Sequence, residues 1–261
     1  MACRSSSGSA RAERGGGGGS DRVQDDRWFP HQAPDSQRRE VQRAIAAAAQ
    51  WDRTAHRIAT GDPDALAICG VDAAIEGEHI LAAAVQMRGG RVRERVVARR
   101  PTRLPYIPGM LAFREGAAMA AAVSAIDGTI DCVIVDGNGR IHPRQAGSAV
   151  HLGVATGHPT IGVAKSLLCG RPLGRTQERP TGTLTPIVAD AAMEAEPGRM
   201  IGMAVQTRQY PNVPRVRPVY VSPGHRMTVT SASRLITALA DGTRSPPPIR
   251  EAHAAATSAR R

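Results

Sequence analysis

The sequence predicts an α/β protein with one mixed β-sheet that is covered by helices. Three strand-like runs come first, and the second and third meet at Gly89-Gly90, a two-residue signal for an antiparallel hairpin. Farther along the chain, helical stretches alternate with short apolar strands, which is typical of parallel pairing. The hairpin and the alternation together indicate a sheet with both antiparallel and parallel strands.

The expected elements follow the same order along the chain. A helix over about 36–49 has the apolar period of 3.6 residues, with Asp35 or Ser36 as its N-cap. The strand at 91–100 alternates charged and apolar residues, as an outer strand should. The other expected elements are strands at 66–74 and 80–88, a helix that ends at 127–128, a strand at 132–135, a helix near 145–156, a strand at 160–164, a run at 200–207, a strand at 218–221 and a helix at about 231–240.

The order β-β-β-α-β-α-β is the connectivity of the ribonuclease H-like fold. In that fold the first and fourth strands lie side by side, and helices flank the sheet. We therefore expect the strand at 66–74 to be the neighbour of the strand at 132–135.

One folded domain is expected between two tails. Residues 1–35 contain a run of five glycines and no apolar periodicity, which predicts disorder. Residues 243–261 contain three consecutive prolines and an end rich in alanine and arginine, which predicts a flexible tail. The remaining residues, 36–242, are enough for one hydrophobic core.

The chain is strongly basic. Its formal net charge is +11 and its pI is near 10.9, and residues 36–242 alone hold 25 basic and 17 acidic residues. This charge fits a polyanionic partner such as nucleic acid, although a bias toward arginine codons would produce it as well.

The cysteines indicate a reducing compartment. Cys69, Cys132 and Cys169 lie beside apolar runs without paired spacing, as small core residues do. No stretch is long and apolar enough to span a membrane, and the N-terminus lacks the apolar segment of a signal peptide. We expect a soluble, cytoplasmic protein that acts as a monomer and has no membrane partner.

Two carboxylates stand in strands that otherwise exclude charge. Asp72 interrupts the first strand, and Asp136 ends the strand at 132–135. If those strands are neighbours, both carboxylates lie at one edge of the sheet, where their repulsion shifts their pKa values. A hard divalent cation such as Mg²⁺ removes this cost. For Asp136 the alternative is an ordinary aspartate that begins a turn.

Glu115 supplies a third carboxylate. It belongs to a helical stripe that is otherwise apolar and is expected to pack on the sheet. An exposed glutamate early in a helix would be ordinary, whereas one inside an apolar stripe is expected to meet a metal ion. Three acids from two strands and a helix suit metal-assisted hydrolysis of a phosphodiester.

Lys165 is the only lysine, beside 33 arginines. An arginine supplies charge as well, but it does not supply a compact amine that directs one charge at one oxygen. Lys165 follows the strand at 160–164, so we expect it at the same sheet edge as Asp136. There its amine can hold a phosphate oxygen or position the attacking water. The alternative is chance survival under codon bias.

Two histidines are candidates for proton transfer or for a fourth metal contact, His142 and His225. His225 lies between a predicted strand and a predicted helix, where a loop can present its ring to a site. The alternative for either residue is a structural role, which is the more common use of a single histidine.

The segment Pro105-Tyr106-Ile107-Pro108-Gly109 presents a tyrosine between two prolines. Proline restricts the backbone on both sides, so the ring projects from a stiff loop, where it can stack in the gap left by an extruded base. The alternative is a hydrophobic plug at the start of a helix. Four glycines allow the close backbone approach that a base pocket needs: Gly109, Gly137, Gly139 and Gly162.

Together these motifs resemble the endonuclease V family of inosine-directed nucleases. The resemblance covers roughly residues 36–240 and is sharpest in three stretches, at 105–115, 135–144 and 160–170. It implies a catalytic domain over 36–242 in which Mg²⁺ or Mn²⁺ is bound by three carboxylates. The residues it assigns to the metal are Asp72, Glu115 and Asp136, with Lys165 and His225 assisting the chemistry.

The resemblance also implies how the base is recognised. Tyr106 is the wedge, and backbone around Gly109, Gly137 and Gly162 holds the flipped hypoxanthine. The family hydrolyses the second phosphodiester bond 3′ to the deaminated base in DNA and leaves 3′-hydroxyl and 5′-phosphate ends. Asn138 is a departure, because the family usually has histidine there, and asparagine cannot shuttle a proton.

Three functions therefore stay open at this point. The first is a DNA repair endonuclease that acts on deoxyinosine, and the second is an endoribonuclease that prefers inosine in single-stranded RNA. The third is a binder of deaminated nucleic acid without catalysis. The presence of all three carboxylates favours the first two.

Overall fold

The computed structural model describes residues 27–30, 32–102, 104–208 and 216–260. The disorder predicted for residues 1–26 lies outside this part of the chain. The strands are β1 (Ile68–Glu76), β2 (His79–Arg88), β3 (Arg91–Pro101), β4 (Cys132–Asp136), β5 (Thr160–Ala164), β6 (Arg171–Pro172), β7 (Leu184–Val188), β8 (Met200–Val205) and β9 (Val219–Pro223). The helices are α2 (Asp35–Ala48), α3 (His56–Thr60), the 3₁₀ turn η1 (Pro63–Ala65), α4 (Leu111–Ser124), α5 (Ser148–Thr156), α6 (Val229–Ala238) and α7 (Pro247–Ser258).

The strands form one mixed sheet in the order β3-β2-β1-β4-β5-β9-β8-β7-β6. β1–β2 and β2–β3 pair antiparallel, the latter through the predicted hairpin at Gly89-Gly90, whereas β1–β4 and β4–β5 pair parallel. The predicted mixed sheet is confirmed, and so is the neighbourhood of the first and fourth strands. β6 and β7 were not expected, because their segments are rich in proline and glycine and show no strand periodicity.

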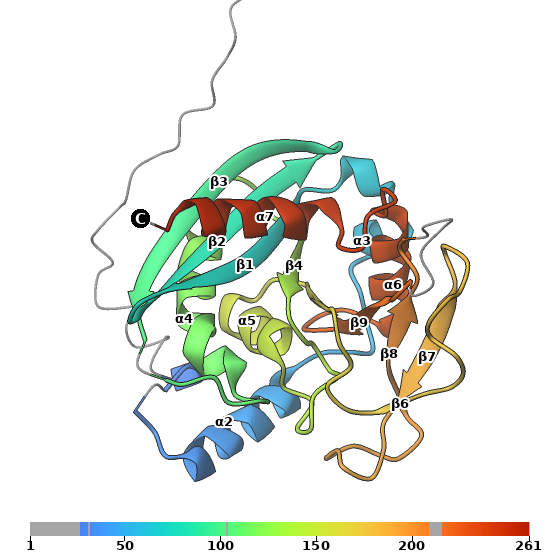
Figure 1. Cartoon of the computed structure of the whole chain (residues 1–261), viewed down its shortest axis with the longest axis horizontal. Helices are drawn as coiled ribbons and strands as arrows, with labels where there is room; N and C mark the ends of the chain where they lie inside the picture. The colour runs from blue at the N-terminus through green and yellow to red at the C-terminus, as the bar shows by residue number, and fades with distance from the viewer. Residues whose placement is uncertain (1–26, 31, 103, 209–215, 261) are drawn as a thin grey trace, which may run out of the picture.

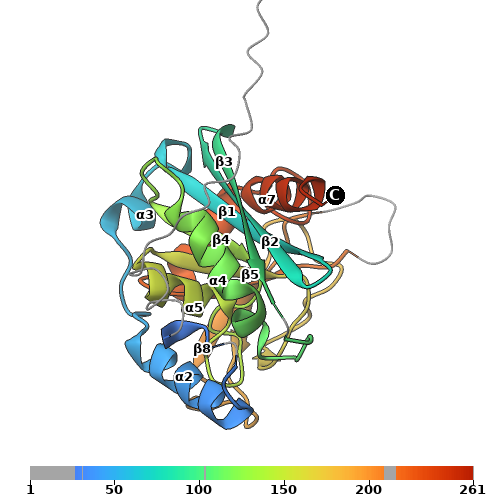
Figure 2. The same ribbon diagram turned by 90° about the vertical axis from the view of Figure 1, so that its left-hand side faces the viewer.

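Helices cover both faces of the sheet (Figures 1 and 2). Val133 and Val135 of β4 pack in one apolar cluster with α4 and α5. Cys132 and Ile134, which alternate with them, pack in a second cluster with α6 and α7. Because β4 is buried on both faces, its sequence is apolar throughout rather than alternating.

The C-terminal segment is folded, so the prediction of a flexible tail over 243–261 is wrong. α7 begins after Pro246 and lies across β1 and β2 (Figure 1). Its apolar side consists mainly of alanine, with Ala252 and Ala256 fully buried against the sheet. Gly70 of β1 permits this contact, since a Cβ there would lie 2.0 Å from the carbonyl oxygen of Pro248.

Residues 27–30 and 32–34, before α2, are also placed in the fold, which corrects the prediction of disorder for this part of residues 1–35. Phe29 is 1% exposed and belongs to the main core cluster. α2 begins close to the expected residue, but its N-cap is Pro34, and Asp35 lies in the first turn instead. Two adjacent aromatic residues followed by Pro30 carry no periodic signal, so only the tertiary contact shows that Phe29 is buried.

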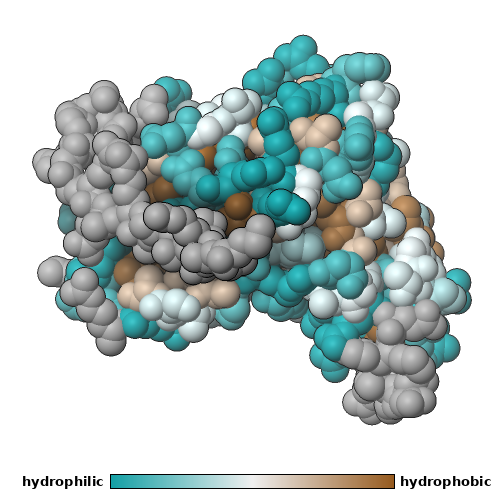
Figure 3. Space-filling model, turned by 90° about the horizontal axis from the view of Figure 1, so that it is seen from above, coloured by the Kyte–Doolittle hydropathy of each residue, from teal (hydrophilic) through white to brown (hydrophobic). Residues whose placement is uncertain are grey.

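The outer surface near β3 is polar. Arg91, Arg93 and Arg95 are exposed at alternate positions of this edge strand. Seen from above, the placed residues of the surface are largely hydrophilic (Figure 3). Within the ordered ranges, no helix has both the length and the apolar character needed to cross a membrane.

Candidate active site

Two parallel strands bring Asp72 and Asp136 to the same edge of the sheet. Val71 of β1 pairs with Val135 of β4, so the aspartate that follows each valine stands at the same level. Asp72 is 9% exposed. Burial raises the pKa of Asp72, and the negative charge of Asp136 raises it further. The predicted convergence of the two carboxylates is therefore observed.

Glu115 on α4 is electrostatically coupled to this pair. Its burial raises the pKa of its carboxyl group to about 7; Arg114 lowers the pKa, whereas Asp72 and Asp136 raise it. A glutamate with this pKa is partly protonated near neutral pH. The three predicted carboxylates thus form one group of mutually repelling acids.

The chemistry of these carboxylates fits a hard divalent cation. No three Asp, Glu, His or Cys side chains among the described residues are close enough to form a ligand set in this conformation. Mg²⁺ needs only one or two carboxylates because it keeps several waters, and Asp72 and Asp136 offer such a pair. A cation would offset the repulsion and the cost of burying charge, which together raise the pKa values of Asp72 and Glu115.

Lys165 directs its amine at this edge, as predicted. Its Nζ lies 2.7 Å from Oδ2 of Asp136, and the lysine side chain is 51% exposed. The guanidinium of Arg244 donates hydrogen bonds to the carbonyl oxygens of Lys165 and Pro218. The backbone that carries the lysine is therefore held, while its side chain is half exposed to solvent.

His253 joins the carboxylates and was not predicted. Its Nδ1 lies 2.7 Å from Oδ2 of Asp72, the distance of a hydrogen bond from the ring to the carboxylate. His253 follows the buried Ala252 on α7, with its own side chain 62% exposed. The available signal was the apolar period of Ile249, Ala252 and Ala256, which indicates a helix in the segment that was predicted to be a tail.

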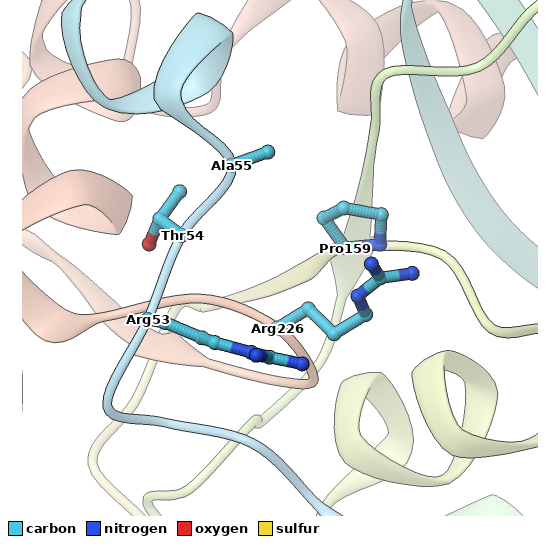
Figure 4. Close-up of a pocket in the computed structure, with 5 residues that line it drawn as sticks. All are labelled: Arg53, Thr54, Ala55, Pro159 and Arg226. Atoms are coloured by element: carbon cyan, nitrogen blue, oxygen red, sulfur yellow. The ribbon is translucent and has the colours of Figure 1, made fainter.

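His225 lies elsewhere, which corrects its expected grouping with the carboxylates. Its backbone N–H donates to Oγ1 of Thr160, the first residue of β5. Thr160 pairs with Val133, three residues before Asp136, so roughly 10 Å of strand separates the two levels. A nearby cavity of about 120 Å³ is lined by Arg53, Thr54, Ala55, Pro159 and Arg226 (Figure 4). Both the histidine and this cavity belong to the amino end of β5.

His142 is buried and uncharged rather than poised for proton transfer. Burial lowers its pKa to about 4. Its Nδ1 accepts hydrogen bonds from the backbone N–H groups of Arg144 and Ala146, and its Nε2 lies 2.9 Å from the carbonyl oxygen of Gly109. Because both ring nitrogens are engaged within the protein, His142 has no nitrogen left for a metal ion or a substrate.

Tyr106 projects from the protein between the exposed residues Pro105 and Pro108. It is 65% exposed, the highest value among the large hydrophobic residues that are placed. A hydrophobic plug at the start of α4 would be buried, so that alternative is excluded. The loop ends at Gly109, directly before the helix that carries Glu115.

Comparisons with known proteins show the family. Residues 52–254 match the family model of endonuclease V. This chain belongs to the endonuclease V family. An endonuclease V of Natronomonas pharaonis is 44% identical over 212 residues, which cover 80% of this chain and 85% of the relative. As a family member, the chain is a DNA repair nuclease.

Solved structures of endonuclease V share the fold. The crystal structure from Streptomyces avermitilis superposes with a TM-score of 0.75 at 31% identity, covering 88% of this chain and 94% of that one. The enzyme from Ciona intestinalis, solved with a 24mer DNA containing an inosine followed by a ribo-adenosine, gives a TM-score of 0.68. At 22% identity, covering 86% of this chain and 98% of that chain, this second likeness shows the fold alone.

Gly162 and Gly137, two glycines predicted to lie near the base, differ in how closely other atoms approach them. A Cβ on Gly162 would lie 2.2 Å from the backbone nitrogen of Gly139, so this glycine permits β5 to pack against the 137–139 turn. At Gly137 the nearest atom would be 3.5 Å away, which leaves ordinary space. Next to it, Oδ1 of Asn138 is buried without a hydrogen-bond partner, at the position where the family usually has histidine.

Proposed function

We propose that this endonuclease V recognises deoxyinosine in DNA and hydrolyses the second phosphodiester bond 3′ to it. The products are expected to have 3′-hydroxyl and 5′-phosphate ends. The observation that carries the proposal is the meeting of Asp72, Asp136 and Lys165 at one sheet edge, coupled to Glu115 on the helix that follows an exposed tyrosine loop. The resemblance to the family supplies the position of the cut.

Asp72, Asp136 and Glu115 are the residues proposed to hold Mg²⁺, for which Mn²⁺ can substitute. A bound ion of this kind supplies an activated water and offsets charge on the phosphate. The raised pKa values of Asp72 and Glu115 support this role, because negative charges without a cation are costly at this site.

Lys165 and His253 are proposed to assist the reaction. The ammonium group of Lys165, now 2.7 Å from Asp136, is free to bind one phosphate oxygen when the nucleic acid arrives. His253 Nδ1 contacts Asp72, which orients the ring and leaves Nε2 to exchange a proton with water or substrate. His253 thus takes the role that was expected of His225.

Tyr106 is proposed to be the wedge that fills the gap when the inosine leaves the base stack. Its exposure in the unbound protein supports this, because a stacking side chain must reach the nucleic acid. Backbone near Gly109 and Gly137 is proposed to contact the extruded base. Gly162 is proposed to support the backbone near Gly137, because it packs directly against Gly139.

The proposed partner is DNA that contains deoxyinosine, bound by a monomer in the cytoplasm. The net charge of +11 favours a phosphate backbone as ligand. The complex of the Ciona enzyme with inosine-containing DNA supports the choice of lesion. Cys69 and Cys132 are free and buried, which fits a reducing compartment.

Cleavage of three labelled substrates tests the proposal: duplex DNA, single-stranded DNA and single-stranded RNA, each with one inosine. We expect cleavage of inosine-containing DNA that requires Mg²⁺ and stops when EDTA is added. Cleavage of the RNA alone would establish the endoribonuclease instead. Binding without cleavage of any substrate, with Mg²⁺ or Mn²⁺ present, would establish a non-catalytic binder.

A further inference from the structure

The tyrosine loop is tied to the core through one backbone carbonyl. The carbonyl oxygen of Gly109 accepts a hydrogen bond from Nε2 of Gln42 at 2.7 Å, and Nε2 of His142 lies 2.9 Å away. Gln42 is 0% exposed and His142 is 2% exposed. Gly109 has a φ of +76°, which favours glycine at this corner. Two buried donors therefore hold the residue at which the loop becomes α4.

Each donor is fixed in turn by a second contact. Oε1 of Gln42 accepts a hydrogen bond from Nε of Arg144, so the amide group must turn its nitrogen toward Gly109. Nδ1 of His142 accepts from the backbone N–H of Arg144 at 3.2 Å, so the ring proton is on Nε2. The two side chains thus meet the carbonyl oxygen as donors.

We propose that Gln42 and His142 are positioning residues that hold the Tyr106 loop rigid for the opening of duplex DNA. This inference rests on the proposed function. A wedge separates stacked bases only if its own backbone does not yield, and Tyr106 stands three residues before the held carbonyl. Gln42 belongs to α2, outside residues 52–254 that match the family model, so the helix before the matched region contributes to substrate selection.

Duplex and single-stranded substrates separate this role from a general effect on folding. Extrusion of inosine from a duplex breaks pairing and stacking, whereas an inosine in a single strand is already unpaired. A loosened wedge therefore slows cleavage of the duplex more than cleavage of the single strand. A loss of folded protein lowers both rates by the same factor.

The test is Gln42→Glu and Gln42→Leu, compared with Arg43→Leu as a matched control. Gln42→Glu keeps the shape and the acceptor for Arg144 but loses the donor to Gly109, and it stays informative if the leucine variant is unstable. Arg43 is the next residue on α2 and faces Glu194 at the surface, at 2.9 Å. Measurements are kcat and KM with Mg²⁺ on duplex and single-stranded DNA, each with one inosine.

We expect both Gln42 variants to lower the ratio of duplex to single-strand kcat/KM at least fivefold, while Arg43→Leu leaves the ratio unchanged. A 2-aminopurine beside the inosine should report less unstacking at saturating protein without metal. An unchanged ratio, whether both rates fall equally or neither falls, would overturn the inference while the proposed function stands. Failure of the unaltered protein to cleave either substrate would instead remove the proposed function, and this inference with it.

Discussion

The two ends of the parallel strands β4 and β5 both carry polar residues, but these residues have different partners. At the carboxyl end, Asp136 and Lys165 form an ion pair, and the charge of Asp136 raises the pKa of Asp72. At the amino end, the hydroxyl of Thr160 donates to the carbonyl oxygen of Ala149 and accepts from the backbone of His225. At the amino end the polar groups form hydrogen bonds within the fold, whereas at the carboxyl end the ion pair is partly exposed to solvent.

This contrast shows what separates a reactive edge from a structural one. His225 was expected to join the carboxylates, yet it lies at the amino end, where its backbone completes the hydrogen bonds of β5. Trp51 adds to that closure by donating from Nε1 to the carbonyl oxygen of Gly224 at 2.7 Å. Perturbed acids near open cations mark the functional end more reliably than the residue types alone.

The largest effect should come from the carboxylates themselves. Asp72→Asn and Asp136→Asn should each lower kcat by at least about a thousandfold, roughly 4 kcal/mol, because each removes a proposed metal ligand. Binding to inosine DNA should persist or strengthen, since a negative charge that faces phosphate is lost. Gel-shift and single-turnover assays measure the two effects separately.

Asp131→Asn is the control from the opposite end of β4. Asp131 accepts a hydrogen bond from the backbone of Ala67 and pairs with Arg57, so its loss should lower thermal stability and leave kcat nearly unchanged. Near-normal Mg²⁺-dependent turnover in Asp72→Asn or Asp136→Asn would show that the metal assignment is incorrect.

The two histidines should differ by about two orders of magnitude. His253→Ala should lower kcat roughly a hundredfold, at the low end of the range for proton transfer by a positioned side chain. His225→Ala should leave kcat within about twofold, because the ring is far from the carboxylates, and should act on the melting temperature instead. Steady-state kinetics and thermal melts of both variants decide the matter, and a reversed order would return His225 to the site.

Lys165→Arg sharpens the comparison without changing net charge. A wide, planar guanidinium cannot replace the compact ammonium beside Asp136, so kcat should fall at least tenfold, about 1.4 kcal/mol. Thermal stability should hardly change, since the side chain is half exposed. Wild-type turnover in this variant would mean that the single lysine is only a product of codon usage.

The smallest expected effect concerns selection rather than reaction. Tyr106→Ala should reduce the preference for inosine over undamaged DNA by roughly fivefold, about 1 kcal/mol, the lower end of the range for base–aromatic stacking. The rate on bound inosine substrate should suffer less. Competition assays with matched undamaged duplexes measure the preference, and an unchanged value would leave Tyr106 without a wedge role.

Much of the candidate site could be predicted because its residues are unusual for the sequence around them. Asp72 interrupts an apolar strand, and Lys165 follows one in a chain that otherwise uses arginine. The hairpin at Gly89-Gly90 predicted the pairing of β2 with β3, and the alternation of helices with the apolar strands β4 and β5 predicted parallel pairing. Each feature is a short local pattern, and the element order of the ribonuclease H-like fold then indicated that β1 and β4 are neighbours.

What the sequence by itself determined was the mixed sheet around β1–β5, the edge where Asp72 and Asp136 meet, and the family. The tertiary structure alone decided that Phe29 enters the core and that α7 delivers His253 to Asp72. The physical reason is that the alanines of α7 carry little hydropathy signal, and they are buried only because the sheet lies opposite them, as Ala252 packs with Val85 and Met87. The choice between His225 and His253 depended on that long-range packing, which no local pattern contains.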